Sequence, residues 1–148
     1  MANIAVLGHG VVGSGVLEVL TSHAASIAKR AKEEIHVKYI LDLKEFPGLP
    51  YSDRFTKDFN VILNDPEVQI VVGGLHPAYD FVKACLENGK SVVTSNKELV
   101  AQKGAELLAI AQANNLNFLF EASVGGGIPI IRPISQCLAA NDVTEIAG

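Results

Sequence analysis

Glycines near the start of the chain have the spacing of a phosphate-binding loop. Residues 8–13 read Gly-His-Gly-Val-Val-Gly and fit the pattern G-x-G-x-x-G. In such a loop Gly8 permits a tight turn, Gly10 lets a pyrophosphate approach the main chain, and Gly13 lets the next helix pack against the preceding strand. The alternative is a glycine-rich turn without a ligand. We expect only the backbone of His9 to matter, and the contacts to come from Gly8, Gly10, Val11, Val12 and Gly13.

A single carboxylate, Asp42, follows the second predicted strand. At this position of a dinucleotide-binding unit, an acidic residue accepts hydrogen bonds from the adenosine ribose and repels a 2′-phosphate. Asp42 therefore favours NAD over NADP, whereas Lys44, two residues further on, would favour NADP. The alternative for Asp42 is a residue that only caps its own loop.

Lys97 stands where a cation is unfavourable for a helix. Ser95 and Glu98 fit the capping box S-x-x-E, which explains both as structural residues. Lys97 lies in the first turn of the same predicted helix, where its charge opposes the helix dipole. The turn also follows a strand at the edge where ligands bind in parallel sheets. Lys97 is therefore either a contact to cofactor or substrate or a solvated surface lysine.

A second glycine-rich segment combines a charged residue with exposed backbone. Glu121 ends an apolar strand, residues 125–127 are all glycine, and Pro129 occupies the expected first position of a helix. Carboxylate and main-chain carbonyl oxygens suit a hard cation. The alternative is a flexible loop in which Glu121 is satisfied by hydrogen bonds.

Strands and helices alternate along the chain, which predicts parallel βαβ units. The expected fold is α/β: a Rossmann-type, doubly wound, mostly parallel sheet with helices on both faces. Residues 44–54 contain Pro47, Gly48 and Pro50 and are predicted to form a surface loop. The predicted strands are 3–7, 36–41, 68–72, 90–93 and 117–120. The predicted helices are 12–27, 78–88 (closed by Gly89), 98–114 (with a break at Gly104) and 128–140.

Composition narrows the class of protein. The chain has 148 residues, the size of one domain, and its 49% hydrophobic and 19% charged residues argue against disorder. A net charge of −4 without a basic run argues against nucleic-acid and membrane partners. No apolar stretch is long enough for a membrane span, and no signal peptide is visible. We expect a cytoplasmic protein in which Cys85 and Cys137 are reduced and buried.

Three segments together resemble the N-terminal NAD(P)-binding domain of homoserine dehydrogenase: 8–15 (GHGVVGSG), 91–101 (SVVTSNKELVA) and 120–131 (FEASVGGGIPII). The resemblance implies an oxidoreductase that interconverts L-homoserine and L-aspartate 4-semialdehyde in threonine, methionine and isoleucine biosynthesis. By the same resemblance, Lys97 contacts the nicotinamide or substrate as a catalytic or binding residue. It also implies a sodium ion held by Glu121, Val124, Gly126 and Ile128.

The resemblance covers one domain of a larger family architecture. Residues 1–148 match the dinucleotide-binding domain, and no counterpart of the family's substrate and dimerisation domain is present. We therefore expect the chain to lack turnover by itself, and the full-length protein to form a homo-oligomer. One alternative is a non-catalytic nucleotide-sensing module, and another is a different amino-acid dehydrogenase. Lys97 and residues 121–129 favour a dehydrogenase over a sensor, which has no need of them.

Overall fold

The computed structural model describes residues 1–73, 79–124, 127–137, 144–145 and 147. Its centre is one sheet in the order β3-β2-β1-β4-β5-β6, and every neighbouring pair of strands is parallel. This order is that of a Rossmann fold, so the predicted doubly wound sheet is confirmed. The strands are β1 (Ala2–Leu7), β2 (Ile35–Leu41), β3 (Phe55–Thr56), β4 (Val68–Gly73), β5 (Ser91–Thr94) and β6 (Phe118–Leu119).

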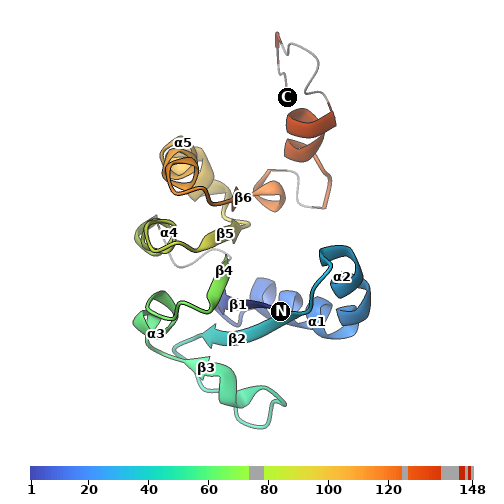
Figure 1. Ribbon diagram of the computed structural model, residues 1–148, viewed down its shortest axis with the longest axis vertical. Helices are drawn as coiled ribbons and strands as arrows, with labels where there is room; N and C mark the ends of the chain where they lie inside the picture. Colours follow the sequence, from blue (N-terminus) through green and yellow to red (C-terminus); the bar gives the residue numbers. More distant parts are fainter. Residues whose placement is uncertain (74–78, 125–126, 138–143, 146, 148) are drawn as a thin grey trace.

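Helices cover both faces of the sheet, as predicted. In Figure 1, α1 and α2 lie on one face, and α3, α4 and α5 lie on the other. The helices are α1 (Val11–Ser22), α2 (Ala24–Ala31), α3 (Phe59–Leu63), α4 (Tyr79–Glu87) and α5 (Lys97–Ala113). Short helical turns are η1 (Ser52–Arg54), η2 (Glu121–Ser123) and the π-helical η3 (Pro133–Cys137).

Strand β1 divides the core into two parts because successive side chains point to opposite faces. Ile4 and Val6 pack with Leu17 of α1, whereas Ala5 and Leu7 join the larger cluster under α4 and α5. That larger cluster includes Cys85, which is 1% exposed, and burial raises the pKa of its thiol to about 12. The prediction of a buried Cys85 is confirmed; the side chain of Cys137 lies outside the described part.

The long helix predicted over 12–27 is two helices. The chain turns by 83° at His23, between α1 and α2. In the last turn of α1, the hydroxyl groups of Thr21 and Ser22 donate to carbonyl oxygens four residues earlier, a contact that bends helices. In the described part, no single helix is long and apolar enough to cross a membrane, although α1 and α2 together meet that test by length and composition.

Three further predictions need correction. The sequence predicted neither β3 nor α3, which are two and five residues long and too short for a periodic pattern. Helix α5 continues through Gly104, where a β-carbon would lie 3.3 Å from Val100 Cγ1. The predicted helix 128–140 becomes helical only at residue 131, two residues after Pro129, and its last three residues lie outside the described part.

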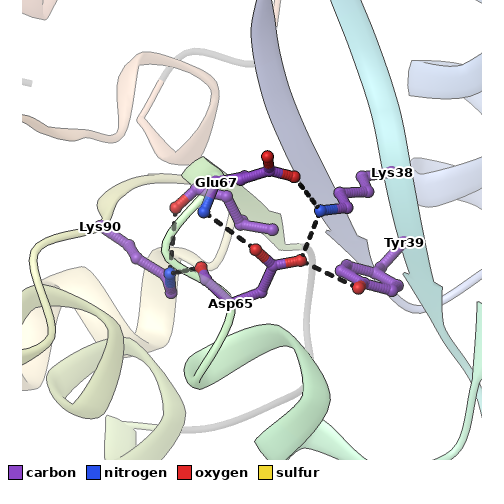
Figure 2. Close-up of polar contacts among 6 residues, drawn as sticks. Lys38, Tyr39, Asp65, Glu67 and Lys90 are labelled. Carbon is purple, nitrogen blue, oxygen red and sulfur yellow. Dashed lines mark hydrogen bonds and ion pairs between the residues drawn. The ribbon is translucent and has the colours of Figure 1, made fainter.

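Polar contacts of Asp65, just before β4, connect β2 to β4 near the amino-terminal edge of the sheet. Figure 2 shows Lys38, Tyr39 and the backbone of Glu67 converging on the carboxylate of Asp65, while Lys90 reaches the main chain. Lys38 Nζ lies 2.7 Å from Asp65 Oδ2, and the Tyr39 hydroxyl donates to the same oxygen at 2.9 Å. Lys38 foremost, with these other donors, lowers the pKa of Asp65 to about 2 despite its partial burial.

Replacing Asp65 is expected to change stability in a pH-dependent way. The folded state lowers the pKa of Asp65 from 3.8 to about 2. Its contribution is therefore complete above the unfolded value and is lost as pH falls from about 4 to about 2. Asp65→Asn should lower the free energy of unfolding by about 1–2 kcal/mol at pH 7, with little difference at pH 2. Denaturant melts across this range measure both values.

The control is Glu67→Gln, which also removes a carboxylate from Lys38. The Glu67 side chain is 69% exposed, so its ion pair should contribute less than about 0.5 kcal/mol. An equal loss of stability for both variants at pH 7 would contradict the role given to Asp65.

Candidate dinucleotide site at the carboxyl edge of the sheet

The glycine loop has the geometry that its sequence predicts. It connects β1 to α1, at the point where the strand order reverses between β1 and β4. Gly8 has a φ of +92°, which favours glycine, and its N–H donates to Leu41 O at 2.7 Å. A β-carbon on Gly13 would lie 1.8 Å from Gly8 O, so only glycine lets α1 start this close to β1.

The amino end of α1 faces open space. Gly10 caps the helix in an extended conformation, and a β-carbon there would meet nothing within 4 Å. Val11 is 93% exposed. The free N–H groups of the first helical turn and the helix dipole attract an anion such as a phosphate. The amino end of α1 is therefore uncovered at the loop where Gly8, Gly10 and Gly13 were predicted to contact a pyrophosphate.

Asp42 lies beside the glycine loop, and one of its carboxylate oxygens accepts a hydrogen bond from the loop backbone. Its Oδ2 accepts from the His9 N–H at 2.8 Å, and its Oδ1 accepts from the Lys44 N–H at 2.9 Å. Burial raises the pKa of Asp42, but these backbone donors at Lys44 and His9 outweigh it and leave that pKa below its ordinary value. A charged carboxylate at this edge retains lone pairs for ribose hydroxyls, so both the ribose role and the capping role fit.

A cavity of about 440 Å³ lies on the β2 side of the glycine loop. The rings of Phe59 and Phe81, with centroids 4.1 Å apart, give it an apolar wall. Asp42, Lys44 and Lys57 give it charged groups. A flat apolar wall beside a carboxylate suits a heteroaromatic base joined to a ribose. The cavity is lined by Gly8, Leu41, Asp42, Leu43, Lys44, Lys57, Phe59 and Phe81.

A second cavity, of about 400 Å³, lies on the β5 side of the same loop. Val12 and Val16 of α1 form one wall, and the ends of β4, β5 and β6 form the others. Its walls are largely apolar, and the polar residues that line it are Thr94, Ser95, Glu121, Arg132 and Gln136. The glycine loop therefore separates two cavities, one at each end of the site that a dinucleotide would span.

Lys97 lies at the predicted edge but outside the lining of the second cavity. It is the first residue of α5 and is exposed. The helix is capped by Asn96, whose side-chain oxygen accepts from the Leu99 N–H at 3.1 Å, and not by Ser95 as the capping box predicted. The N–H of Asn96 in turn donates to Thr94 Oγ1. The cap is one residue later than predicted, and Lys97 is the first residue of the helix that follows β5.

Glu121 is held by hydrogen bonds from the backbone that follows it. Its carboxylate accepts from the N–H groups of Ile130, Ile131 and Arg132, the last two at 2.8 and 2.7 Å. The N–H of Ile130 foremost lowers the pKa of Glu121. These donors are the amides of a starting helical turn, which have no partners within the helix. Glu121 therefore fastens residues 130–132 over the second cavity.

Comparison with known proteins identifies the family to which these features belong. The family model described as homoserine dehydrogenase, NAD binding domain, matches residues 8–121. The chain belongs to the homoserine dehydrogenase family. A homoserine dehydrogenase of Neisseria gonorrhoeae is 40% identical over 151 residues, which cover 99% of this chain and 35% of that protein. The chain thus spans about a third of the length of the curated homoserine dehydrogenases it matches.

Solved structures of homoserine dehydrogenases share the fold. The crystal structure of the Thiobacillus denitrificans enzyme matches with a TM-score of 0.86 and 41% identity, over 95% of this chain and 34% of that one. A hyperthermophilic archaeal homoserine dehydrogenase in complex with NADPH has a TM-score of 0.71, over 90% of this chain and 47% of that one. At 24% identity, that likeness concerns the fold alone.

The sodium site implied by the homoserine dehydrogenase resemblance stays a prediction. The Glu121 carboxylate is engaged by amide donors, and its main-chain oxygen accepts weakly from the Val124 N–H at 3.3 Å. Gly126 lies outside the described residues. Val124 and Ile128 are both exposed. Among the described residues, no group of three or more His, Cys, Asp or Glu side chains is placed to hold a metal ion.

Sequence reasoning missed the aromatic residues of this homoserine dehydrogenase domain. Phe59 and Phe81 come from different helices and meet only in the folded chain. Phe46, Tyr51 and Phe55 surround the ring of His9, whose side chain was expected to have no role. The available signal was the concentration of aromatic residues between positions 46 and 59.

Proposed function

We propose that this chain binds NAD(H) or NADP(H) as the nucleotide-binding part of a homoserine dehydrogenase. The observation that carries the proposal is the glycine loop with a cavity on each side, about 440 and about 400 Å³. Gly8, Gly10, Val11, Val12 and Gly13 would bind the pyrophosphate, with the adenosine beside Asp42 and the nicotinamide beside Val12. Family membership favours this interpretation over a nucleotide-sensing module.

The proposed reaction is the reversible conversion of L-homoserine and NAD(P)⁺ to L-aspartate 4-semialdehyde and NAD(P)H. The cofactor supplies hydride transfer, and this chain orients the ring and excludes water through the apolar walls of the second cavity. The reaction also needs the substrate to be held in attack geometry. The chain spans about a third of the length of the curated relatives it matches. We therefore propose that the 148 residues bind cofactor without turnover. Self-association of the full-length protein and a cytoplasmic location are predictions from the sequence.

Titration of NADH and NADPH tests the proposal directly. The fluorescence of the reduced nicotinamide reports the binding of both reduced dinucleotides. We expect saturable binding with a modest preference for NADH, because Asp42 repels a 2′-phosphate. Absence of binding to both dinucleotides would refute the proposed function. Tighter NADPH binding would assign selectivity to Lys44, and rapid homoserine-dependent NADH formation would refute the expected lack of turnover.

Lys97→Ala should leave the stability of the fold nearly unchanged but lower the activity of the full-length enzyme. Lys97 is exposed in the first turn of α5, where removal of its charge relieves repulsion with the helix dipole. We expect a change in the free energy of unfolding within about 0.5 kcal/mol. In a full-length homoserine dehydrogenase carrying this domain, we expect kcat to fall by about tenfold or more. The control is Lys103→Ala, on the same helix. If the two variants have equal kcat values, Lys97 is a surface lysine without a role in the reaction.

We also propose that sodium binds through Glu121 and the main-chain oxygens of Val124, Gly126 and Ile128. The support is the family resemblance and the exposure of Val124 and Ile128. A titration of thermal stability with sodium chloride, with potassium and choline chloride as controls, tests it. An equal response to all three salts would remove the site from this chain.

A further inference from the structure

The side chain of His9 is enclosed in a way that phosphate binding does not require. Its ring centroid lies 4.5 Å from that of Phe46, 5.2 Å from that of Phe55 and 5.8 Å from that of Tyr51. Phe46 and Phe55 also stack on each other, with centroids 5.1 Å apart. We call His9, Phe46, Tyr51 and Phe55 the aromatic cluster. The middle residue of the first Gly-x-Gly is thus packed against a segment more than thirty residues away.

The aromatic cluster contains one specific polar contact. His9 Nε2 lies 3.1 Å from the Tyr51 hydroxyl, and His9 Nδ1 is buried with no hydrogen-bond partner among the described residues. A proton on Nδ1 would therefore be a buried donor without an acceptor, which is costly. The neutral tautomer with its proton on Nε2 is favoured, and it donates to the Tyr51 oxygen. Tyr51 is thus the residue that fixes the orientation of the imidazole ring.

The aromatic cluster adds contacts to a loop that has little regular structure. Residues 44–54 contain Pro47, Gly48 and Pro50, and their regular structure is limited to the short turn η1. Beyond the cluster, Arg54 donates to Val37 O at 3.2 Å, and Glu45 pairs with Lys57 at 2.8 Å. Tyr51 and Phe55 also pack against the core cluster that contains Val6 and Ile40, so the His9 ring is one of several contacts that position this loop relative to Gly8.

Charged side chains at the two ends of this loop region line the adenosine end of the proposed site: Lys44 and Glu45 begin the loop, and Lys57 follows β3. Lys44 lines the cavity of about 440 Å³, and with Glu45 and Lys57 it lines a neighbouring cavity of about 410 Å³. In the fastened loop, Lys57 is paired with Glu45, and both oxygens of Asp42 are held by backbone donors. This arrangement leaves the Asp42 carboxylate beside the cavity and places the Glu45 carboxylate on Lys57 in an exposed ion pair, which weakens the attraction of Lys57 for another anion. A loosened loop would let Lys44 move toward a phosphate and would remove Glu45 from Lys57.

We propose that His9 and Tyr51 form a positioning pair that sets discrimination between a ribose 2′-hydroxyl and a 2′-phosphate; the proposal rests on the dinucleotide binding proposed above. The pair acts through the loop and does not touch the cofactor. By fixing residues 44–54 to the glycine loop, it maintains the Lys57–Glu45 pair and the position of Asp42. Loss of the pair shifts selectivity toward NADPH, whichever dinucleotide the unaltered chain prefers.

The test measures dissociation constants for NADH and NADPH with Tyr51→Phe and His9→Leu. We expect the ratio of the NADPH constant to the NADH constant to fall by about fivefold in both variants, the effect of one hydrogen bond. His9→Gln, whose amide can still donate to Tyr51, should retain more selectivity than His9→Leu. The matched control is Tyr39→Phe, which loses a hydroxyl bond to Asp65 at the opposite edge of the sheet and should keep the ratio.

Each outcome decides between distinct conclusions. If the unaltered chain binds NADH or NADPH but both ratios stay unchanged, the pair has no positioning role, and the proposed function still stands. An equal change in Tyr39→Phe would overturn the pair as well, because it would trace selectivity to general stability. If the unaltered chain binds neither dinucleotide, the proposed function and the pair fail together. Far-ultraviolet circular dichroism of each variant establishes that it is folded, and Tyr51→Phe removes only one oxygen.

Discussion

Gly13→Ala is expected to disrupt both the fold and the dinucleotide site. The added β-carbon would lie 1.8 Å from Gly8 O and 2.9 Å from Gly8 C, far inside van der Waals contact. Both atoms belong to backbone whose positive φ is set by the turn after β1, so the clash cannot be relieved by a side-chain rotation. We expect a loss of about 3 kcal/mol in the free energy of unfolding, a large part of the stability of a domain this size.

The same substitution should weaken dinucleotide binding in any fraction that folds. To relieve the clash, α1 must move away from β1, and its amino end carries the amides that would meet the pyrophosphate. We expect NADH affinity to fall by about tenfold or more, or 1.4 kcal/mol. Urea denaturation followed by circular dichroism gives the stability, and NADH fluorescence gives the affinity.

Gly15→Ala is the matched control. Gly15 lies two residues further along α1, and a β-carbon there would meet nothing within 4 Å. Alanine favours a helix interior over glycine, so Gly15→Ala should stabilise the chain by about 0.5–1 kcal/mol and leave NADH affinity unchanged. Opposite signs for the two variants would assign the effect to close packing at Gly13. Normal stability and affinity in Gly13→Ala would refute the packing role of this glycine.

The parts of the fold that were predictable are those set by local patterns. The turn over residues 8–13 depends only on the strand before it, the helix after it and the contact between them, so a few neighbouring residues specify it. Gly89 likewise has a φ of +78°, as the glycine that closes a helix should. The alternation of apolar strands and helices then leaves a parallel sheet as the natural arrangement.

The parts that were not predictable depend on contacts between distant residues. One difference is local: the cap of α5 falls on Asn96 and not on Ser95, because serine and asparagine are both favoured N-cap residues and the sequence pattern does not choose between them. Phe59 and Phe81 form one cavity wall only after α3 and α4 pack together. For Glu121, the sequence left two interpretations open, and three backbone donors now favour the hydrogen-bonded one.

Removing Lys90 is expected to have the largest effect at the amino edge of the sheet. Lys90 is 2% exposed, and its ammonium donates to Asp65 O at 2.6 Å and to Val68 O at 3.0 Å. These contacts join the turn before β4 to the start of β5 (Figure 2). Burial lowers the pKa of Lys90, which shows that desolvation opposes its charge. The hydrogen bonds and the buried aliphatic stem must together outweigh that cost.

Two variants separate the two contributions of Lys90. Lys90→Ala removes both the ammonium and the stem, and the resulting cavity and unpaired carbonyls should cost about 3–4 kcal/mol. Lys90→Met keeps an apolar stem of similar length, so we expect a loss of about 1–2 kcal/mol. Lys83→Ala, which breaks an exposed pair with Glu87, should change stability by less than about 0.5 kcal/mol. Urea denaturation of the variants gives these values.

The sign of the Lys90→Met effect is decisive because buried charges often stabilise less than apolar replacements do. If Lys90→Met is as stable as the unaltered chain, only the stem matters and the contacts to Asp65 O and Val68 O are incidental. If it loses stability while Lys90→Ala loses more, both parts contribute. Lys90 lies at the edge of the sheet opposite the glycine loop. Folded Lys90→Met should therefore bind NADH with unchanged affinity, in contrast to Gly13→Ala, where stability and affinity fall together.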